Sequence, residues 1–304
     1  MRRLDLKAHA KINLSLDIFG TRPDGFHEIS TVMQQIELYD EVCVKWIEAE
    51  FASGDTGIKI EINSNKRFLP KDRRNLAYRA SEIMIGRYGG AGKIGPGTIR
   101  VDIKKQIPVG AGLGGGSSDC AAVLKALSDL WDLGLSAGEL CGLGAEIGSD
   151  VPFCIMGQEG FPCAIAKGTG TDITPVQGLK RWVVLSKPPI SVSTANVYKG
   201  FDSIEAGTFC RPDNGELVVA MREKNFAAVD KNLINVLENY TMNEYPEVRR
   251  TKERMISGTS PVQTVMSGSG PTIAGFYTNR KNAEAAYGKM ALFNKETFLT
   301  RTKE

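Results

Sequence analysis

A glycine-rich run from Gly110 to Ser118 carries the residue types best suited to phosphate chemistry in this 304-residue chain. Glycine has no Cβ atom, so the backbone can pass close to a phosphate chain and turn its N–H groups towards the oxygens. Apolar residues at helical spacing follow the run, among them Val123 and Leu127. A helix that starts there adds the positive end of its dipole to the same place. The run is therefore predicted to be a phosphate-binding loop rather than a flexible linker.

Two common classes of glycine loop fit this run poorly. A Walker loop ends in Gly-Lys-Ser or Gly-Lys-Thr, whereas here Ser117 directly follows the last glycine. A dinucleotide-binding fingerprint matches formally between Gly110 and Gly115. The strand before that fingerprint should be almost continuously apolar, but residues 98–103 alternate and Pro108 intervenes. A nicotinamide-dependent enzyme is thus disfavoured.

The N-terminal segment offers a second set of polar groups. Residues 8–18 alternate strictly, with apolar residues at every even position, which predicts a half-buried strand. The polar face of this strand would hold His9, Lys11, Asn13, Ser15 and Asp17. Residues two apart on one face lie about 7 Å from each other, so Lys11 and Asn13 are able to reach the same ligand.

The elements that must position these groups in the first half alternate between strands and helices. Strands are predicted near residues 42–47, 58–62 and 98–103, and helices over 75–88 and 120–131. The second of these helices is expected to be capped by Ser117 or Ser118, with Asp119 in its first turn and an end at Gly134. A short helix should follow from Ser136, because Glu139 completes a capping box. Asp150 comes directly after this helix.

The second half has the pattern of a separate α/β unit. A strand is predicted over 181–185, and residues 262–277 predict two strands joined by a turn at Gly268–Gly270. One or two amphipathic helices are indicated by Leu217, Met221, Val229, Leu233, Val236 and Leu237. The chain is accordingly divided into an N-terminal domain, 1–163, and a C-terminal domain, 164–304.

Composition excludes several classes of protein. Hydrophobic residues make up 42% and the net charge is only +3, which is ordinary for a globular protein and disfavours a nucleic-acid binder. The six cysteines form no C-x-x-C pair and only two histidines occur, so no zinc site is expected. There is no run of about 18 apolar residues and no signal-peptide core. We therefore expect a cytoplasmic protein without a membrane partner; the oligomeric state is not indicated.

The loop is similar to the ATP motif of the superfamily named for galactokinase, homoserine kinase, mevalonate kinase and phosphomevalonate kinase. Its residues are Pro108, Val109, Gly110, Ala111, Gly112, Leu113, Gly114, Gly115, Gly116, Ser117 and Ser118. The extra glycines resemble the branch that acts on 4-diphosphocytidyl-2-C-methyl-D-erythritol. Two more motifs agree in order and span residues 10–272. The first is Ala10–Leu14 followed by Arg22–Glu28, and the second is Met266–Thr272.

The resemblance implies a fold and an activity. The fold would be α+β, with a ribosomal-S5-like, ATP-binding N-terminal domain (1–163) and a ferredoxin-like, substrate-side C-terminal domain (164–304). The reaction would be transfer of the γ-phosphoryl group of ATP, with Mg²⁺, to the 2-hydroxyl of 4-diphosphocytidyl-2-C-methyl-D-erythritol. This step belongs to the non-mevalonate route to isoprenoid precursors. Other small-molecule kinases of the superfamily, of the homoserine or mevalonate type, and a non-catalytic nucleotide-binding module remain as alternatives.

The resemblance also implies residue roles. Asp150 matches the catalytic base, and Lys11 matches the lysine that orients it and offsets charge on the transferring group. Phe26 and His27 would recognise the cytosine, and Asn75 and Lys105 match positions of the adenine pocket. The remaining positions that match substrate contacts are Asn13, Met33, Thr194 and Tyr198. Phe26 replaces a common tyrosine and Met33 a frequent aromatic residue, which leaves stacking at position 33 in question.

Overall fold

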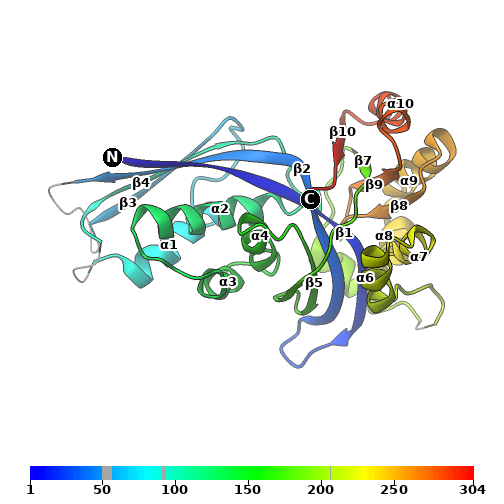
Figure 1. Cartoon of the computed structure of the whole chain (residues 1–304), viewed down its shortest axis with the longest axis horizontal. Helices are drawn as coiled ribbons and strands as arrows, with labels where there is room; N and C mark the ends of the chain where they lie inside the picture. The colour runs from blue at the N-terminus through cyan, green and yellow to red at the C-terminus, as the bar shows by residue number, and fades with distance from the viewer. Residues whose placement is uncertain (50–56, 91–93, 206) are drawn as a thin grey trace. The chain divides into compact units, whose positions relative to one another are not determined.

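The computed structural model describes residues 1–49, 57–90, 94–205 and 207–304, and it contains both helices and strands (Figure 1). Its contacts divide the chain into two compact units. The first unit comprises Met1–Ala10, Tyr39–Ile107 and Gly114–Gly160; the second comprises Lys11–Leu38, Pro108–Leu113 and Phe161–Glu304. Two strands and the glycine-rich loop thus contribute to both units. The boundary predicted near residue 163 lies close to the last of these changes, and the earlier ones were not predicted.

The first unit combines a sheet with four helices. The strands are β1 (Arg2–Thr21), β2 (His27–Glu48), β3 (Ile58–Ser64) and β4 (Gly97–Lys104). The helices are α1 (Leu76–Tyr88), α2 (Gly115–Leu130), α3 (Ala137–Ala145) and α4 (Val151–Gln158). β4 lies between β3 and β2, in parallel with β3 and antiparallel to β2, and β1 pairs with β2. The four helices lie together on one side of this sheet (Figure 1).

Alternation along the strands decides which face of the sheet these helices cover. Val44 and Trp46 on β2, and Val101 on β4, are almost completely buried. The Trp46 ring meets the edge of Trp131, which caps the C-terminus of α2, with ring centroids 5.5 Å apart. Burying a side chain of this size contributes about 1.5–3 kcal/mol. The neighbouring residues on each strand point to the other, more exposed face.

The helix after the glycine-rich loop begins earlier than predicted. Gly114 is its N-cap residue, with φ +66°, and no side chain caps the helix. The prediction of a Ser117 or Ser118 cap was therefore wrong, because a left-handed glycine lets the chain enter the helix at once. The Ser118 hydroxyl instead donates to the backbone oxygen of His9 at 2.7 Å. The helix also ends at Leu130 and does not reach the glycine at position 134.

Two other helix starts follow the sequence closely. Ser136 and Glu139 form the predicted capping box, in which each side chain accepts a backbone N–H from the other residue. Asn75 caps α1, since its side chain accepts the N–H of Ala77. Both devices are local in sequence, which is why they were recognisable.

The second unit contains the remaining elements. Its strands are β5 (Cys163–Gly168), β6 (Asp172–Pro175), β7 (Trp182–Lys187), β8 (Gln263–Met266), β9 (Ile273–Tyr277) and β10 (Glu296–Arg301). Its helices are α5 (Thr194–Phe201), α6 (Asn214–Glu223), α7 (Phe226–Asn232), α8 (Glu238–Glu244), α9 (Pro246–Thr259) and α10 (Arg280–Ala291). β7 to β10 form an antiparallel sheet in the order β10-β7-β9-β8, and β5 pairs with β2. With α10 between β9 and β10, this is the predicted ferredoxin-like arrangement.

The polar face of β1 differs from its prediction. The strand was expected to be half-buried, but Lys11, Asn13 and Ser15 are at most 3% exposed. Within the second unit, Ser15 donates to the side-chain oxygen of Asn214 at 2.5 Å. Asp17 pairs with Arg211 at 2.7 Å. The polar face is therefore buried against hydrogen-bonding partners that come from distant sequence.

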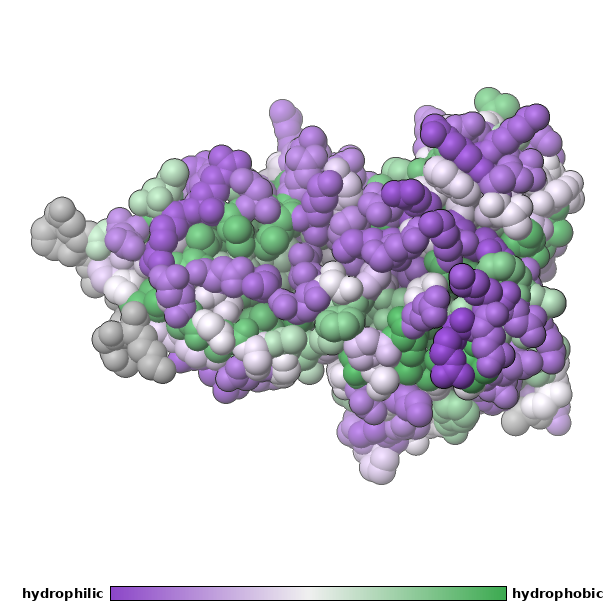
Figure 2. Space-filling model, in the orientation of Figure 1, coloured by the Kyte–Doolittle hydropathy of each residue, from purple (hydrophilic) through white to green (hydrophobic). Residues whose placement is uncertain are grey.

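The described helices include none that is long and apolar enough to cross a bilayer. Figure 2 shows hydrophilic residues over much of the drawn face, with apolar residues in smaller patches between them.

Candidate active site

The glycine-rich loop has a backbone suited to anions. Gly110, Gly112 and Gly114 have φ of +62°, +74° and +66°, so every second residue is left-handed. An alternation of right-handed and left-handed residues forms a concave nest whose N–H groups converge on an anion. α2 begins directly after Gly114 in the chain, and a helix N-terminus by itself favours an anion.

Close backbone contacts anchor the part of the loop that belongs to the second unit. A Cβ atom on Gly112 would lie 2.2 Å from the backbone oxygen of Ser267, so only glycine fits there. The Ser267 hydroxyl donates to the Gly112 oxygen at 2.9 Å. The Leu113 oxygen accepts the N–H of Lys11, also at 2.9 Å. The loop is thereby tied both to β1 and to the turn between β8 and β9.

Asn13 connects the proposed catalytic lysine with that turn. Its side-chain oxygen accepts from the Lys11 ammonium at 2.7 Å and from the Gly268 N–H at 2.9 Å. Its side-chain nitrogen donates to the Thr31 hydroxyl at 2.8 Å. Because Lys11 is only 3% exposed, this amide is a main determinant of where its charge lies. Lys11 and Asn13 are thus in direct contact, and their reach to one ligand stays a prediction.

Asn235 was missed by sequence reasoning, although it holds the turn between β8 and β9. Its side-chain nitrogen donates to the backbone oxygens of Met266 and Gly268, both at 2.7 Å. The residue is buried in the link between α7 and α8. A single asparagine inside the apolar run 233–237 was the available signal. That run had been interpreted as part of a helix face.

In the first unit, a buried ion cluster lies under the start of α2. Lys105 Nζ bonds to one oxygen of Asp40 at 2.5 Å and to one of Asp119 at 2.7 Å, and all three side chains are buried. A Cβ atom on Gly115 would lie 3.0 Å from the same ammonium. The cluster thus positions this helix start. Asp119 was expected in the first turn of the helix. It lies instead beyond that turn and belongs to the buried ion cluster.

The charges of this cluster are strongly coupled. Burial raises the pKa of Asp119 to about 7; Lys105 lowers it, and Asp40 raises it further. For Lys105, burial acts to lower the pKa, but Asp119 and Asp40 outweigh it and raise the pKa. At Asp119, burial outweighs the nearby ammonium, whereas at Lys105 the two carboxylates together outweigh burial.

The predicted adenine-pocket residues have structural partners in the first unit. Asn75 donates from its side chain to the Pro70 oxygen at 2.9 Å while it caps α1. Asn65 pairs with the backbone of Lys105, accepting its N–H at 2.8 Å and donating to its oxygen at 3.2 Å. Contacts of Asn75 and Lys105 with adenine stay predictions.

Asp150 is the N-cap residue of α4, and its side chain does not cap the helix. Its carboxylate therefore lies at the positive end of a helix dipole, where a negative charge is favoured. Asp150 belongs to the first unit and Lys11 to the second. Their approach to one another stays a prediction.

Three of the predicted substrate residues, Thr194, Tyr198 and His27, lie on or against α5 in the second unit. His27 Nε2 lies 2.7 Å from a carboxylate oxygen of Asp202, and the ring centroids of His27 and Tyr198 are 4.9 Å apart. The hydroxyls of Thr194 and Ser269 are 2.8 Å apart.

Two other predicted substrate residues, Phe26 and Met33, differ in their exposure to solvent. Phe26, in the link between β1 and β2, is 60% exposed, so it is accessible to a ligand. Met33 is only 1% exposed and pairs in register with Ala164. A substrate contact through Met33 stays a prediction that this burial does not favour.

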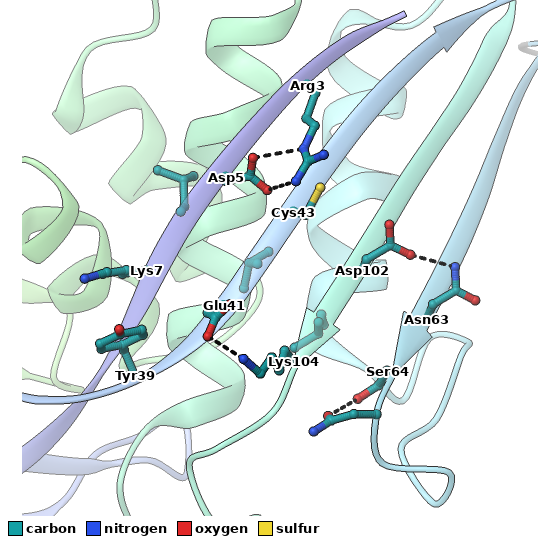
Figure 3. A pocket seen from close by; sticks show the side chains of 14 residues that line it. Arg3, Asp5, Lys7, Tyr39, Glu41, Cys43, Asn63, Ser64, Asp102 and Lys104 are labelled. Atoms are coloured by element: carbon teal, nitrogen blue, oxygen red, sulfur yellow. Dashed lines mark hydrogen bonds and ion pairs between the residues drawn. The ribbon is translucent and has the colours of Figure 1, made fainter.

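A groove of about 860 Å³ lies on the open sheet face of the first unit, but it is a different feature. None of its described lining residues was predicted as a site residue. Figure 3 shows that its charged and amide groups pair with one another: Arg3 with Asp5, Lys104 with Glu41, and Asn63 with Asp102. Its polar groups are largely satisfied within the protein.

Comparison with known proteins is consistent across sequence and structure. Residues 75–158 match the family description "GHMP kinases N terminal domain" and residues 217–295 match "GHMP kinases C terminal". A 4-diphosphocytidyl-2-C-methyl-D-erythritol kinase of Alkaliphilus metalliredigens is 40% identical, over 99% of this chain and 97% of its own. One from Geobacillus sp. (strain WCH70) is 44% identical, over 98% and 96%.

Solved structures add the fold. A 4-(cytidine 5'-diphospho)-2C-methyl-D-erythritol kinase superposes with a TM-score of 0.78 at 27% identity, covering 99% of this chain and all of the other. A homoserine kinase from Cytophaga hutchinsonii reaches 0.73 at 16% identity, which is similarity of fold alone, and covers 100% and 95%. The two-domain α+β fold predicted from the sequence is confirmed. On the full-length identity to its relatives, this chain belongs to the family of the 4-diphosphocytidyl-2-C-methyl-D-erythritol kinases within the GHMP kinases.

Proposed function

We propose that this protein transfers the γ-phosphoryl group of ATP to the 2-hydroxyl of 4-diphosphocytidyl-2-C-methyl-D-erythritol. The observation that carries the proposal is the Asn13 amide, which joins the Lys11 ammonium to the second glycine turn at Gly268. Such a junction places a fixed positive charge beside a backbone that is able to receive phosphates. The relatives that bear the name of this kinase supply the acceptor.

In the proposed mechanism, Asp150 takes the proton of the acceptor hydroxyl. Lys11 offsets the negative charge on the group being transferred and helps to orient Asp150. Phosphoryl transfer passes through a loose transition state, so positioning and charge stabilisation supply most of the acceleration. The nest at Gly110–Gly114 and the N-terminus of α2 would hold the phosphates of ATP.

Mg²⁺ is proposed to enter as the magnesium complex of ATP, the usual form of this co-substrate. Among the described residues, no group of three or more His, Cys, Asp or Glu side chains is placed to hold a metal ion. The Ser118 hydroxyl is engaged with the His9 backbone. The donor set therefore fits an ion held largely by phosphates, with Ser117 as the hydroxyl beside it. Six free thiols support a reducing compartment, and we propose the cytoplasm.

A panel of acceptors tests this function. The protein is incubated with ATP and Mg²⁺ and with one acceptor at a time: 4-diphosphocytidyl-2-C-methyl-D-erythritol, 2-C-methyl-D-erythritol 4-phosphate, homoserine or mevalonate. We expect phosphate transfer to the first compound only. Transfer to homoserine or mevalonate instead would assign another kinase activity. ATP binding without transfer to any acceptor would leave a nucleotide-binding module.

A further inference from the structure

One face of α5 holds the imidazole of His27 by two contacts. Tyr198 packs its ring against that of His27 at an interplanar angle of 48°. Asp202, the C-cap residue four positions later, places a carboxylate oxygen 2.7 Å from His27 Nε2. The His27 side chain is only 11% exposed, so its orientation depends on these contacts.

The same face of α5 is fixed at its other end. Thr194, Tyr198 and Asp202 are spaced by four residues, so they lie above one another on one side of the helix. The Thr194 hydroxyl is 2.8 Å from that of Ser269 in the second glycine turn. Through α5, Asp202 is thereby linked to the turn between β8 and β9. Asn13 joins the same turn to Lys11, the proposed catalytic lysine.

Helix stability does not account for an acidic residue at position 202. The C-terminus of a helix carries the negative end of the dipole, which disfavours a carboxylate. The hydrogen bond to His27 is the compensating interaction that the structure offers at this place. This points to a role of Asp202 in setting the state of the imidazole.

The partner of Nε2 decides what Nδ1 is able to do. An ionised carboxylate only accepts hydrogen bonds, so Nε2 must carry the hydrogen. In the neutral ring Nδ1 then has a lone pair and acts as an acceptor. Within the described part of the chain, the bond to Asp202 is the one hydrogen bond of this ring, which leaves Nδ1 for a ligand.

We propose that Asp202 is a positioning residue that makes the site select cytosine over uracil through the tautomer of His27. The proposal rests on the proposed function and on the contact with cytosine that the family resemblance implies for His27. Cytosine presents an amino donor at position 4, whereas uracil presents a carbonyl acceptor there. A ring nitrogen that accepts bonds the first and is repelled by the second. A site that leaves a polar group unpaired rejects the wrong ligand strongly.

Substitution of Asp202 by asparagine tests the specificity. An amide can accept from Nε2–H or donate to a bare Nε2, so both tautomers become available. We compare kcat/KM for the cytidine acceptor with that for its uridine analogue. Asp202→Asn should reduce the preference for cytosine by about tenfold, which corresponds to about 1.4 kcal/mol, and should leave the KM for ATP unchanged. Glu205→Gln removes an exposed charge nearby and serves as the control, with no change expected.

A spectroscopic readout tests the tautomer without relying on any variant. The chain has only two histidines, so ¹⁵N-histidine labelling gives two imidazole signals, and His27→Gln identifies which belongs to His27. At a pH where the ring is neutral, wild-type His27 should show the Nε2–H form, and Asp202→Asn should show both forms. A wild-type Nδ1–H form would overturn the proposal. A cytosine preference of Asp202→Asn within about twofold of the wild-type preference would overturn it as well.

Failure of this proposal is distinguishable from failure of the proposed function. If the cytidine acceptor is phosphorylated but the preference does not depend on Asp202, only the present inference fails. If neither acceptor is phosphorylated, the proposed function fails. Calorimetry with CDP and UDP then measures the base preference directly, and equal affinities would overturn the role of Asp202 as well.

Discussion

The side-chain oxygen of Asn13 accepts the backbone N–H of Gly268 at 2.9 Å, which joins the first strand to a turn 255 residues later. The same oxygen receives the Lys11 ammonium. One buried amide therefore fixes both a charge and a backbone turn. This arrangement gives a polar residue hydrogen-bonding partners in the part of β1 that is buried on both faces.

Replacing Asn13 by alanine should damage stability and turnover together. The change leaves the Gly268 N–H without its acceptor and removes one hydrogen-bond partner of Lys11. An unsatisfied buried group costs about 1–3 kcal/mol, so urea denaturation should show a loss of this size in the free energy of unfolding. Asn63→Ala removes an amide that bonds Asp102 at the half-buried sheet face and should cost less. Equal losses in the two variants would contradict this role of Asn13.

Gly112→Ala and Gly110→Ala form a matched pair for the loop. Both glycines are left-handed, but a Cβ on Gly112 would meet the Ser267 oxygen at 2.2 Å, whereas nothing lies within 4 Å at Gly110. Gly110→Ala should cost only the strain of a positive φ, about 1 kcal/mol. Gly112→Ala must in addition displace the turn at Ser267. Thermal unfolding should show a clearly larger drop in Tm for Gly112→Ala, and the opposite order would refute the close approach.

The sequence was most informative where a feature depends on near neighbours. The capping box of Ser136 and Glu139 and the turn between β8 and β9 were predicted and are present. The cap of α2 was misassigned because two serines at a helix start usually act as caps, whereas here Gly114 performs that task through its backbone. The burial of Ser15 depends on Asn214, a partner 199 residues away that no local pattern reveals. The spacing of residues along a strand was enough to predict Asn13 as a site residue. Its hydrogen bond to Gly268 could not be predicted, because the two residues are 255 positions apart in the sequence.

Gly114→Val should abolish ATP binding while the protein stays folded. A branched side chain at φ +66° is strained, and it would also stand in the nest proposed for the phosphates. Gly134→Val places the same strain at φ +62°, outside the loop, where nothing lies within 4 Å. Calorimetry should find no ATP binding for Gly114→Val and normal binding for Gly134→Val. Normal affinity in a folded Gly114→Val protein would remove this glycine from the phosphate site.

Asp119→Asn should change how stability depends on pH. The carboxyl titrates near 3.8 when unfolded and near 7 when folded, so the folded protein binds more protons between these values. Its contribution to stability therefore falls as the pH rises from about 4 to about 7. Relative to wild type, Asp119→Asn should gain stability on going from pH 5 to pH 8 in urea titrations. Asp129 is partly exposed on the same helix, and Asp129→Asn should show no such gain. If the stability of Asp119→Asn instead changed with pH as that of wild type does, the pKa of Asp119 would not be raised in the folded protein.

The last prediction concerns the proposed base. Asp150→Asn keeps the shape of the side chain and removes its charge, so proton transfer from the acceptor should fail while binding persists. A general base contributes typically 10²–10⁴-fold, and we expect single-turnover rates to fall by roughly 10²-fold or more. Affinities for ATP and acceptor should change far less. Lys11→Met should give a similar defect, and the double variant should be little worse than either single one, because groups that act as a unit are not additive. Multiplicative losses in the double variant would mean that the two residues act independently. Near-normal chemistry in Asp150→Asn would mean that the proton leaves by another route, and that Asp150 serves only to begin α4.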